Sequence, residues 1–86
     1  MADDPYFGDL FKAKAISDED VNAAVDAYMA DPTTGRFMIG EHPADLASAV
    51  ARSPYAQSML ADPGIENASK RSAVRTAILL ARPVKV

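Results

Sequence analysis

Six prolines divide this chain of 86 residues into short segments, and they limit its fold more than any other feature. They stand at positions 5, 32, 43, 54, 63 and 83. A proline disfavours helical geometry in the residue before it and fits the first turn of a helix, so each one marks a helix boundary. The sequence therefore predicts several short helices rather than a few long ones.

Between the prolines, apolar side chains recur three and four positions apart, as on one face of a helix. This spacing predicts helices over residues 5–15, 17–30, 43–52, 54–61 and 67–82. The last of them has the widest apolar face, which includes Val74, Ile78 and Leu80. The run from Arg36 to Ile39 is too short to classify by its period, and we expect it to be extended.

The expected fold is all-α, a small bundle of four to five short helices with a short extended segment near residues 36–39. Seventeen alanines favour helix but bury little area each, so the core is expected to be thin. Cysteine is missing from the sequence, which excludes disulfides and thiolate metal sites. We expect residues 1–16 to form an N-terminal amphipathic arm or first helix, and residues 17–86 a single helical domain.

An aromatic cluster lies near the start of the chain. Tyr6, Phe7 and Phe11 are three of the six aromatic residues, and Leu10 lies among them. Burying Phe7, Leu10 and Phe11 is worth roughly 5 to 8 kcal/mol before ordering costs, enough to anchor a marginal core or to support micromolar docking. Two alternatives are therefore open. The cluster packs on this chain's own helices, or it docks on a partner protein, a second copy included.

The five residues from Phe7 to Phe11 resemble three kinds of recognition peptide. They have the Phe-x-x-Leu-Phe spacing of helix-in-groove ligands, and they fit the Phe-x-Asp-x-Phe pattern that endocytic adaptor appendages bind. The segment also looks like the bacterial sliding-clamp peptide, with Phe7 in the place of its leading glutamine. Each resemblance implies a protein partner of a different kind.

Charge is distributed unevenly along the chain, whose net charge is −3. Residues 1–31 hold eight acids, whereas residues 68–86 hold five basic residues and no acid. On the predicted last helix, Arg71, Arg75 and Arg82 lie within about 40° of one another and form a basic stripe. Either the basic end faces the acidic half within the fold, or it meets an acidic partner. The mixed surface charge of small domains favours the first alternative.

Catalytic and metal-binding motifs are missing from the sequence. Its four glycines and one histidine form no phosphate-binding loop, dinucleotide-binding loop, nucleophile elbow or zinc motif. His42 lacks the partners that tune a catalytic histidine. Asp18, Glu19 and Asp20 occupy an expected first helical turn, where capping explains them. We therefore expect no enzymatic activity, no cofactor, no metal site and no small-molecule substrate.

The predicted function is that of a non-enzymatic protein-binding domain, such as an adaptor, a regulator or an inhibitor. The expected partner-binding residues are Tyr6, Phe7, Leu10, Phe11, Arg71, Arg75 and Arg82. One alternative is a structural subunit of a larger assembly, such as a virion or secretion component. Another is a nucleic-acid-associated protein that uses the basic C-terminal helix, which the acidic net charge and a poor helix-turn-helix match disfavour.

The expected location is the cytoplasm, or a virion if the chain is encoded by a phage. No export signal or membrane-spanning run is recognisable in the sequence, since its longest apolar run is far shorter than the roughly 20 residues of a membrane span. The alanine-rich composition suggests a bacterial or phage origin.

Overall fold

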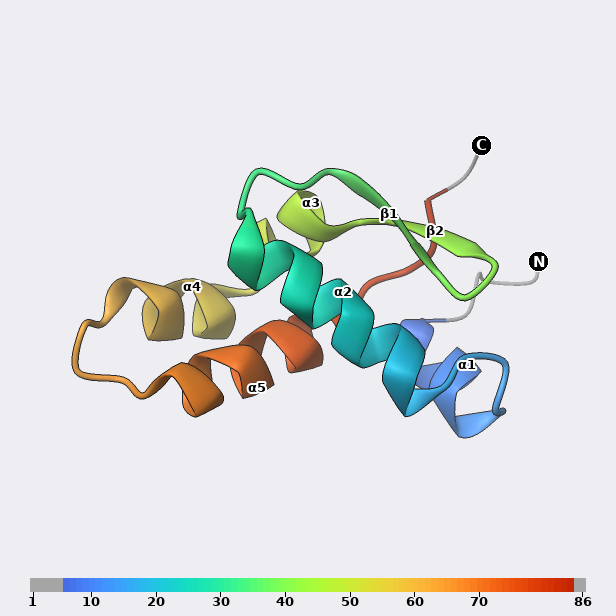
Figure 1. The fold of residues 1–86 in the computed structure, drawn as a ribbon, viewed down its shortest axis with the longest axis horizontal. Coiled ribbons are helices and arrows are strands. Elements are labelled where there is room, and N and C mark those ends of the chain that lie inside the picture. Colours follow the sequence, from blue (N-terminus) through green and yellow to red (C-terminus); the bar gives the residue numbers. More distant parts are fainter. Residues whose placement is uncertain (1–5, 85–86) are drawn as a thin grey trace.

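The computed structural model describes residues 6–84, which form five helices and a two-stranded antiparallel sheet (Figure 1). In chain order, the elements are α1 (Phe7–Lys12), α2 (Asp18–Ala30), β1 (Arg36–Ile39), β2 (His42–Asp45), α3 (Leu46–Ala51), α4 (Pro54–Ala61) and α5 (Asn67–Leu79). The expectation of an all-α fold is therefore wrong, because two segments of the chain form a β-hairpin. The extended segment expected near residues 36–39 is present as β1.

The hairpin forms because β1 meets a second strand directly after a tight turn. The register of β1 and β2 leaves Gly40 and Glu41 as the two turn residues. Gly40 has a φ of 62°, a left-handed geometry that glycine adopts at little cost and that suits two-residue hairpin turns. A Cβ on Gly40 would lie 3.3 Å from side-chain atoms of both Ile16 and Asp20. The turn therefore also packs closely against the start of α2.

Strand β2 replaces the beginning of the helix that the sequence predicts over residues 43–52. Helix α3 begins after Asp45, whose carboxylate Oδ1 accepts a hydrogen bond from the Ser48 backbone N–H at 3.1 Å. Pro43 lies within β2, and its carbonyl oxygen accepts a hydrogen bond from the Val84 backbone N–H at 2.8 Å. The interpretation of Pro43 as a helix start is wrong, because proline also fits the edge of a sheet.

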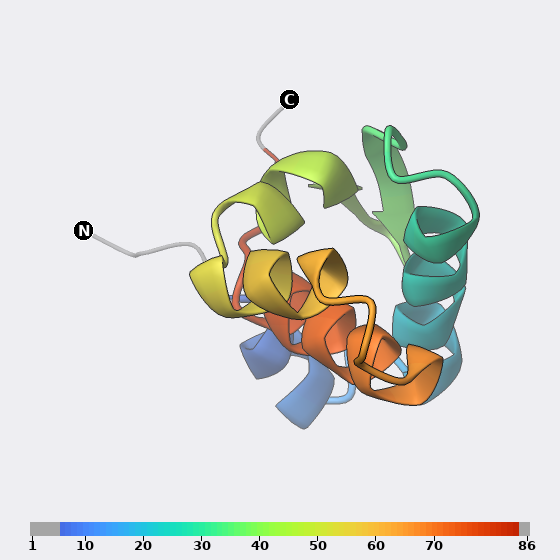
Figure 2. The same ribbon diagram turned by 90° about the vertical axis from the view of Figure 1, so that its left-hand side faces the viewer.

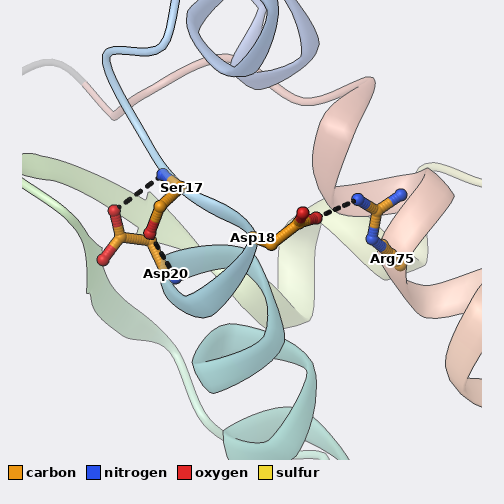
Figure 3. A network of polar contacts seen from close by, with 4 residues as sticks. All are labelled: Ser17, Asp18, Asp20 and Arg75. Carbon is orange, nitrogen blue, oxygen red and sulfur yellow. Dashed lines mark hydrogen bonds and ion pairs between the residues drawn. The ribbon is translucent and has the colours of Figure 1, made fainter.

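Two helices begin where their capping residues predict. At the start of α2, the Asp20 N–H donates to Ser17 Oγ at 3.2 Å and the Ser17 N–H donates to the Asp20 carboxylate at 2.9 Å (Figure 3). At the start of α4, the Ser53 hydroxyl oxygen accepts a hydrogen bond from the Ala56 N–H at 3.2 Å. Side-chain capping satisfies backbone donors that have no partner within the helix. Both helix starts are thus fixed by local sequence.

Helix α5 is central to the packing, since it contacts α1, α2, α3 and α4. Figure 2 shows α1, α2 and α4 on different sides of it. The hairpin contacts α2 through β1 and α3 through β2. The buried apolar side chains are Phe7, Ile16, Val21, Ala24, Val25, Tyr28, Ile39, Ala44, Leu46, Ala49, Val50, Ala56, Ala73, Val74, Ala77 and Ile78. One core therefore connects the described elements.

Helix α5 ends three residues before the end that the sequence predicts. Its last helical residue is Leu79, and the chain leaves the helix at Leu80. Because of this, Leu80 does not join the buried face as expected and is 65% exposed. The carbonyl oxygen of Ala81 accepts a hydrogen bond from the Phe7 N–H at 2.8 Å, so contact with α1 replaces the last expected turn. Arg82 consequently lies beyond the helix.

Helix α1 packs against this end of α5 through Phe7, whose side chain is 0% exposed. Leu10 and Phe11 are half-buried and pack against the same core. Gly8 permits the close approach, because a Cβ there would lie 3.1 Å from the carbonyl oxygen of Leu79. Of the two alternatives for the aromatic cluster, the structure shows these three side chains on the chain's own helices.

The first helix is shorter than the expected span of 5–15. It ends at Lys12, and Lys14 follows with a φ of 63°, the left-handed geometry common just after a helix. Residues 1–5 of the expected N-terminal arm lie outside the described residues, as do residues 85 and 86 of the expected helical domain.

We predict that Phe7→Ala lowers the free energy of unfolding by about 3 to 5 kcal/mol, because it leaves a cavity at a fully buried position. The control is Tyr6→Ala, since Tyr6 is 43% exposed and its loss should cost under about 1 kcal/mol. Urea denaturation followed by circular dichroism measures both. Should the Ala variant fail to fold, Phe7→Leu replaces it, with an expected loss of about 1 kcal/mol. If the Phe7 and Tyr6 variants lost equally small amounts of unfolding free energy, Phe7 would not be part of the core.

Candidate functional site

Two arginines of the expected basic stripe form ion pairs with α2. Arg75 Nη2 lies 3.0 Å from Asp18 Oδ1, and Arg71 Nη2 contacts Asp26 Oδ1. The Arg75 guanidinium also lies over the Phe11 ring, 5.3 Å from its centroid. Figure 3 shows Asp18, in the first turn of α2, facing Arg75 of α5. The acidic and basic parts of the chain thus face each other within the fold, as the first of the two alternatives proposed.

The exposure of these pairs limits their energy. The side chains of Asp26 and Asp18 are 64% and 71% exposed. Exposed ion pairs contribute roughly 0.2 to 1 kcal/mol each, and salt screens them. The ion pairs matter more for nucleic-acid binding than for stability. The phosphates of a nucleic acid would have to compete with carboxylates for Arg71 and Arg75.

We predict a coupling free energy of about 0.2 to 1 kcal/mol between Asp18 and Arg75 in a double-mutant cycle. The cycle compares the wild type with Asp18→Asn, Arg75→Gln and the double variant. Asp18→Asn alone also removes a negative charge that stabilises the start of α2, and the cycle subtracts this separate effect from the free energy of the pair. Urea denaturation at low salt and in about 1 M NaCl measures the coupling, which should fall as salt rises.

The matched control is a cycle of Asp18→Asn with Arg71→Gln, since Arg71 pairs with Asp26 instead. That cycle should give a coupling near zero. Equal coupling in the two cycles would mean that the basic face of α5 acts as a diffuse charge rather than through specific pairs.

Arg82 makes a contact of a different kind. Its guanidinium carbon lies 4.6 Å from the centroid of the Tyr6 ring, and its Nη2 donates a hydrogen bond to the Tyr6 hydroxyl oxygen at 3.3 Å. Stacking on an aromatic ring orders a guanidinium and leaves other N–H donors free for a ligand. Tyr6 is 43% exposed and Arg82 is exposed as well. These two expected partner-binding residues therefore remain at the surface.

Tyr6 and Arg82 line a surface pocket with a volume of about 650 Å³. One side of the pocket is the C-terminal end of α5 and the segment after it, and the other is the junction of α3 and α4. The exposed Leu80 and the half-buried Ala81 and Pro83 supply apolar surface. Arg52, at the C-terminal cap of α3, adds a second arginine. We call this surface the Tyr6–Arg82 pocket.

The charges around the pocket are not balanced. Asp45 lines it too, but its carboxylate caps α3 by accepting the Ser48 N–H. Within residues 6–84, neither Arg52 nor Arg82 forms an ion pair with a carboxylate. As far as the described part of the chain goes, the pocket combines apolar surface with two arginines that pair with no carboxylate.

Sequence reasoning missed Arg52 and assigned Leu80 to the core. Arg52 stands before Ser53 and Pro54, where the sequence signals only a helix boundary. It is far from Arg82 in the chain, and only the packing of α3 and α4 against α5 brings both arginines to one pocket. No local sequence signal could have indicated this arrangement.

The part of the chain that the structure describes brings no three His, Asp or Glu side chains together as a metal site. His42 is half-buried at the turn end of β2. Asp31 follows α2 and is fully exposed, and hydrogen bonds from the hydroxyl and backbone N–H of Thr33 hold its pKa below the ordinary value for a carboxyl group. These hydrogen bonds stabilise a turn, as expected for aspartate at such a position.

None of the helices within residues 6–84 has the length and apolar character of a membrane span. Comparisons of the chain with protein-family models, with curated proteins and with solved structures find no match. The chemistry of the Tyr6–Arg82 pocket is therefore the basis for inferring function.

Proposed function

We propose that this chain is a non-enzymatic protein-binding domain that acts as an adaptor, a regulator or an inhibitor. The observation that carries the proposal is the Tyr6–Arg82 pocket, where exposed apolar surface adjoins two arginines that pair with no carboxylate of residues 6–84. Tyrosine and arginine are enriched among the residues that dominate binding energy in protein interfaces. Exposed apolar surface beside a concave site is also typical of interaction sites.

The proposed binding surface differs from the set of residues that the sequence suggested. Phe7 is fully buried, and Leu10 and Phe11 are half-buried against the core, so in the folded chain they offer a partner little surface. We assign direct contact to Tyr6 and Arg82 of that set, with Leu80 and Arg52 added. The buried cluster would then act indirectly, by holding Tyr6 at the edge of the pocket.

The alternative function, a structural subunit of a larger assembly, would use the same surface for permanent contacts. The two functions differ in the state of the free protein. A domain that meets a separate partner is expected to be a monomer or a small oligomer, whereas an assembly subunit self-associates or is isolated in fixed stoichiometry. Light scattering after size-exclusion chromatography distinguishes them. A cytoplasmic location stays a prediction of the sequence.

To test the proposal, the full chain is used as the target in a selection from a displayed library of random peptides. We predict that selected peptides bind the wild-type chain and that Leu80→Ser weakens their binding about tenfold or more, because Leu80 offers apolar surface at the pocket. The matched control is Tyr55→Ser, since Tyr55 is 59% exposed on α4 and does not line the pocket. Fluorescence anisotropy measures the affinities, and thermal melting checks that both variants fold.

Binding that survives Leu80→Ser, or that falls equally with Tyr55→Ser, would contradict this assignment of the surface. A selection that enriches no peptide with measurable affinity would contradict the protein-binding function itself.

A further inference from the structure

We propose that the Tyr6–Arg82 pocket binds a linear peptide segment of a partner protein in which aspartate or glutamate residues flank an apolar side chain. This rests on the proposed function and names the chemistry of the partner. Three features of the pocket support it: an ordered arginine, a second arginine from another part of the chain, and apolar surface near both.

Arg82 is prepared to bind a carboxylate. Its guanidinium is stacked on the Tyr6 ring, and its hydrogen bond to the Tyr6 hydroxyl uses an Nη2 donor. A guanidinium has five N–H donors in a planar arrangement that matches the two oxygens of a carboxylate. Because the ring already restricts the side chain, a ligand would lose less conformational entropy in ordering it.

Arg52 extends the same chemistry to a second position. It comes from the end of α3, whereas Arg82 follows α5, so two separate segments each contribute one arginine to the lining of the pocket. Asp45 also lines the pocket, and its carboxylate is held by the Ser48 N–H as the cap of α3. The acidic residues of a ligand would therefore lie away from Asp45 and near the two arginines.

The apolar surface lies along the C-terminal end of α5. Leu80 is 65% exposed, and the half-buried Ala81 and Pro83 line the pocket near it in the chain. An apolar side chain of the ligand would shield Leu80 from water, which is favourable in proportion to the apolar area removed. A purely acidic segment would leave this surface exposed, so the ligand is expected to carry an apolar residue between its carboxylates.

The charge of the rest of the chain favours local rather than general recognition of acids. The net charge is −3, and Arg71 and Arg75 are paired with aspartates of α2. An acidic partner is therefore not attracted by the protein as a whole, and at this pocket the cations that can recognise it are Arg52 and Arg82. Polyanions such as nucleic acid, which need several unpaired cations along one surface, fit this distribution less well than a short acidic peptide.

The test uses an array of synthetic peptides of about twelve residues, in which aspartates at varied spacing flank one leucine or phenylalanine. An otherwise identical array carries asparagine in place of aspartate. We expect the best aspartate peptides to bind the full chain with micromolar affinity and their asparagine versions to bind about tenfold or more weakly. Amide chemical shifts measured by NMR should change at Arg52, Leu80 and Arg82. Raising NaCl to about 0.5 M should weaken binding several-fold.

Variants identify the groups responsible. Arg82→Ala and Arg52→Ala should each weaken the best aspartate peptide about fivefold or more. Arg82→Lys should restore part of the loss, because it keeps the charge but not the planar donor arrangement. Lys12→Ala is the matched control, since Lys12 is an exposed cation outside the pocket and its loss should leave the affinity unchanged.

Four outcomes would overturn the inference. Equal binding of asparagine and aspartate peptides would leave an apolar docking site, so the proposed function would stand without its acidic partner. Equal weakening by Lys12→Ala and Arg82→Ala would indicate nonspecific attraction of charge. Binding of a single-stranded oligonucleotide at this pocket, with no binding of the aspartate peptides, would replace the peptide by a nucleic acid. If neither array binds, the acidic partner is rejected, and the selection with Leu80→Ser decides the proposed function separately.

Discussion

The buried face of α5 is the contact on which the other helices depend. Ala73, Val74, Ala77 and Ile78 are buried there, and α1 through α4 each contact this helix. Helices as short as α1 and α3, with six residues each, are unstable in isolation and need tertiary packing. Because alanine side chains are small, the neighbouring helices can approach α5 closely. A thin core is thereby sufficient to hold several short elements.

The docking of α1 on α5 also creates the proposed binding site. Phe7 and Ala81 join the two segments through a backbone hydrogen bond, and the residues directly next to them, Tyr6 and Arg82, meet at the surface. In each of the two segments, a residue that joins α1 to the end of α5 therefore lies directly beside a residue at the surface. The aromatic cluster serves two purposes, since Phe7 anchors the helix and Tyr6 orders an arginine at the edge of a pocket. Any change that loosens α1 would alter both stability and the pocket.

The starts of α2 and α4 could be predicted from sequence because capping is local. Ser17 with Asp20, and Ser53 before Pro54, satisfy backbone donors a few residues away. The second strand could not be predicted in this way, because Pro43 fits either a helix start or a sheet edge and the pairing with β1 decides between them. The charge asymmetry indicated attraction between the two ends of the chain. It did not indicate which arginines would pair and which would remain at the pocket.

Hydrogen exchange at the Phe7 amide most directly tests whether α1 belongs to the cooperative core. This N–H donates to the carbonyl oxygen of Ala81, so it is exposed to solvent only when α1 leaves α5. If α1 opens only with the whole fold, the Phe7 amide is protected as strongly as the amide of Ile78 within the buried face of α5. Exchange of the Phe7 amide at nearly the rate of an unstructured chain, with Ile78 still protected, would show that α1 detaches independently. The aromatic cluster would then be available to a partner, and the Tyr6–Arg82 pocket would not be a fixed feature of the protein.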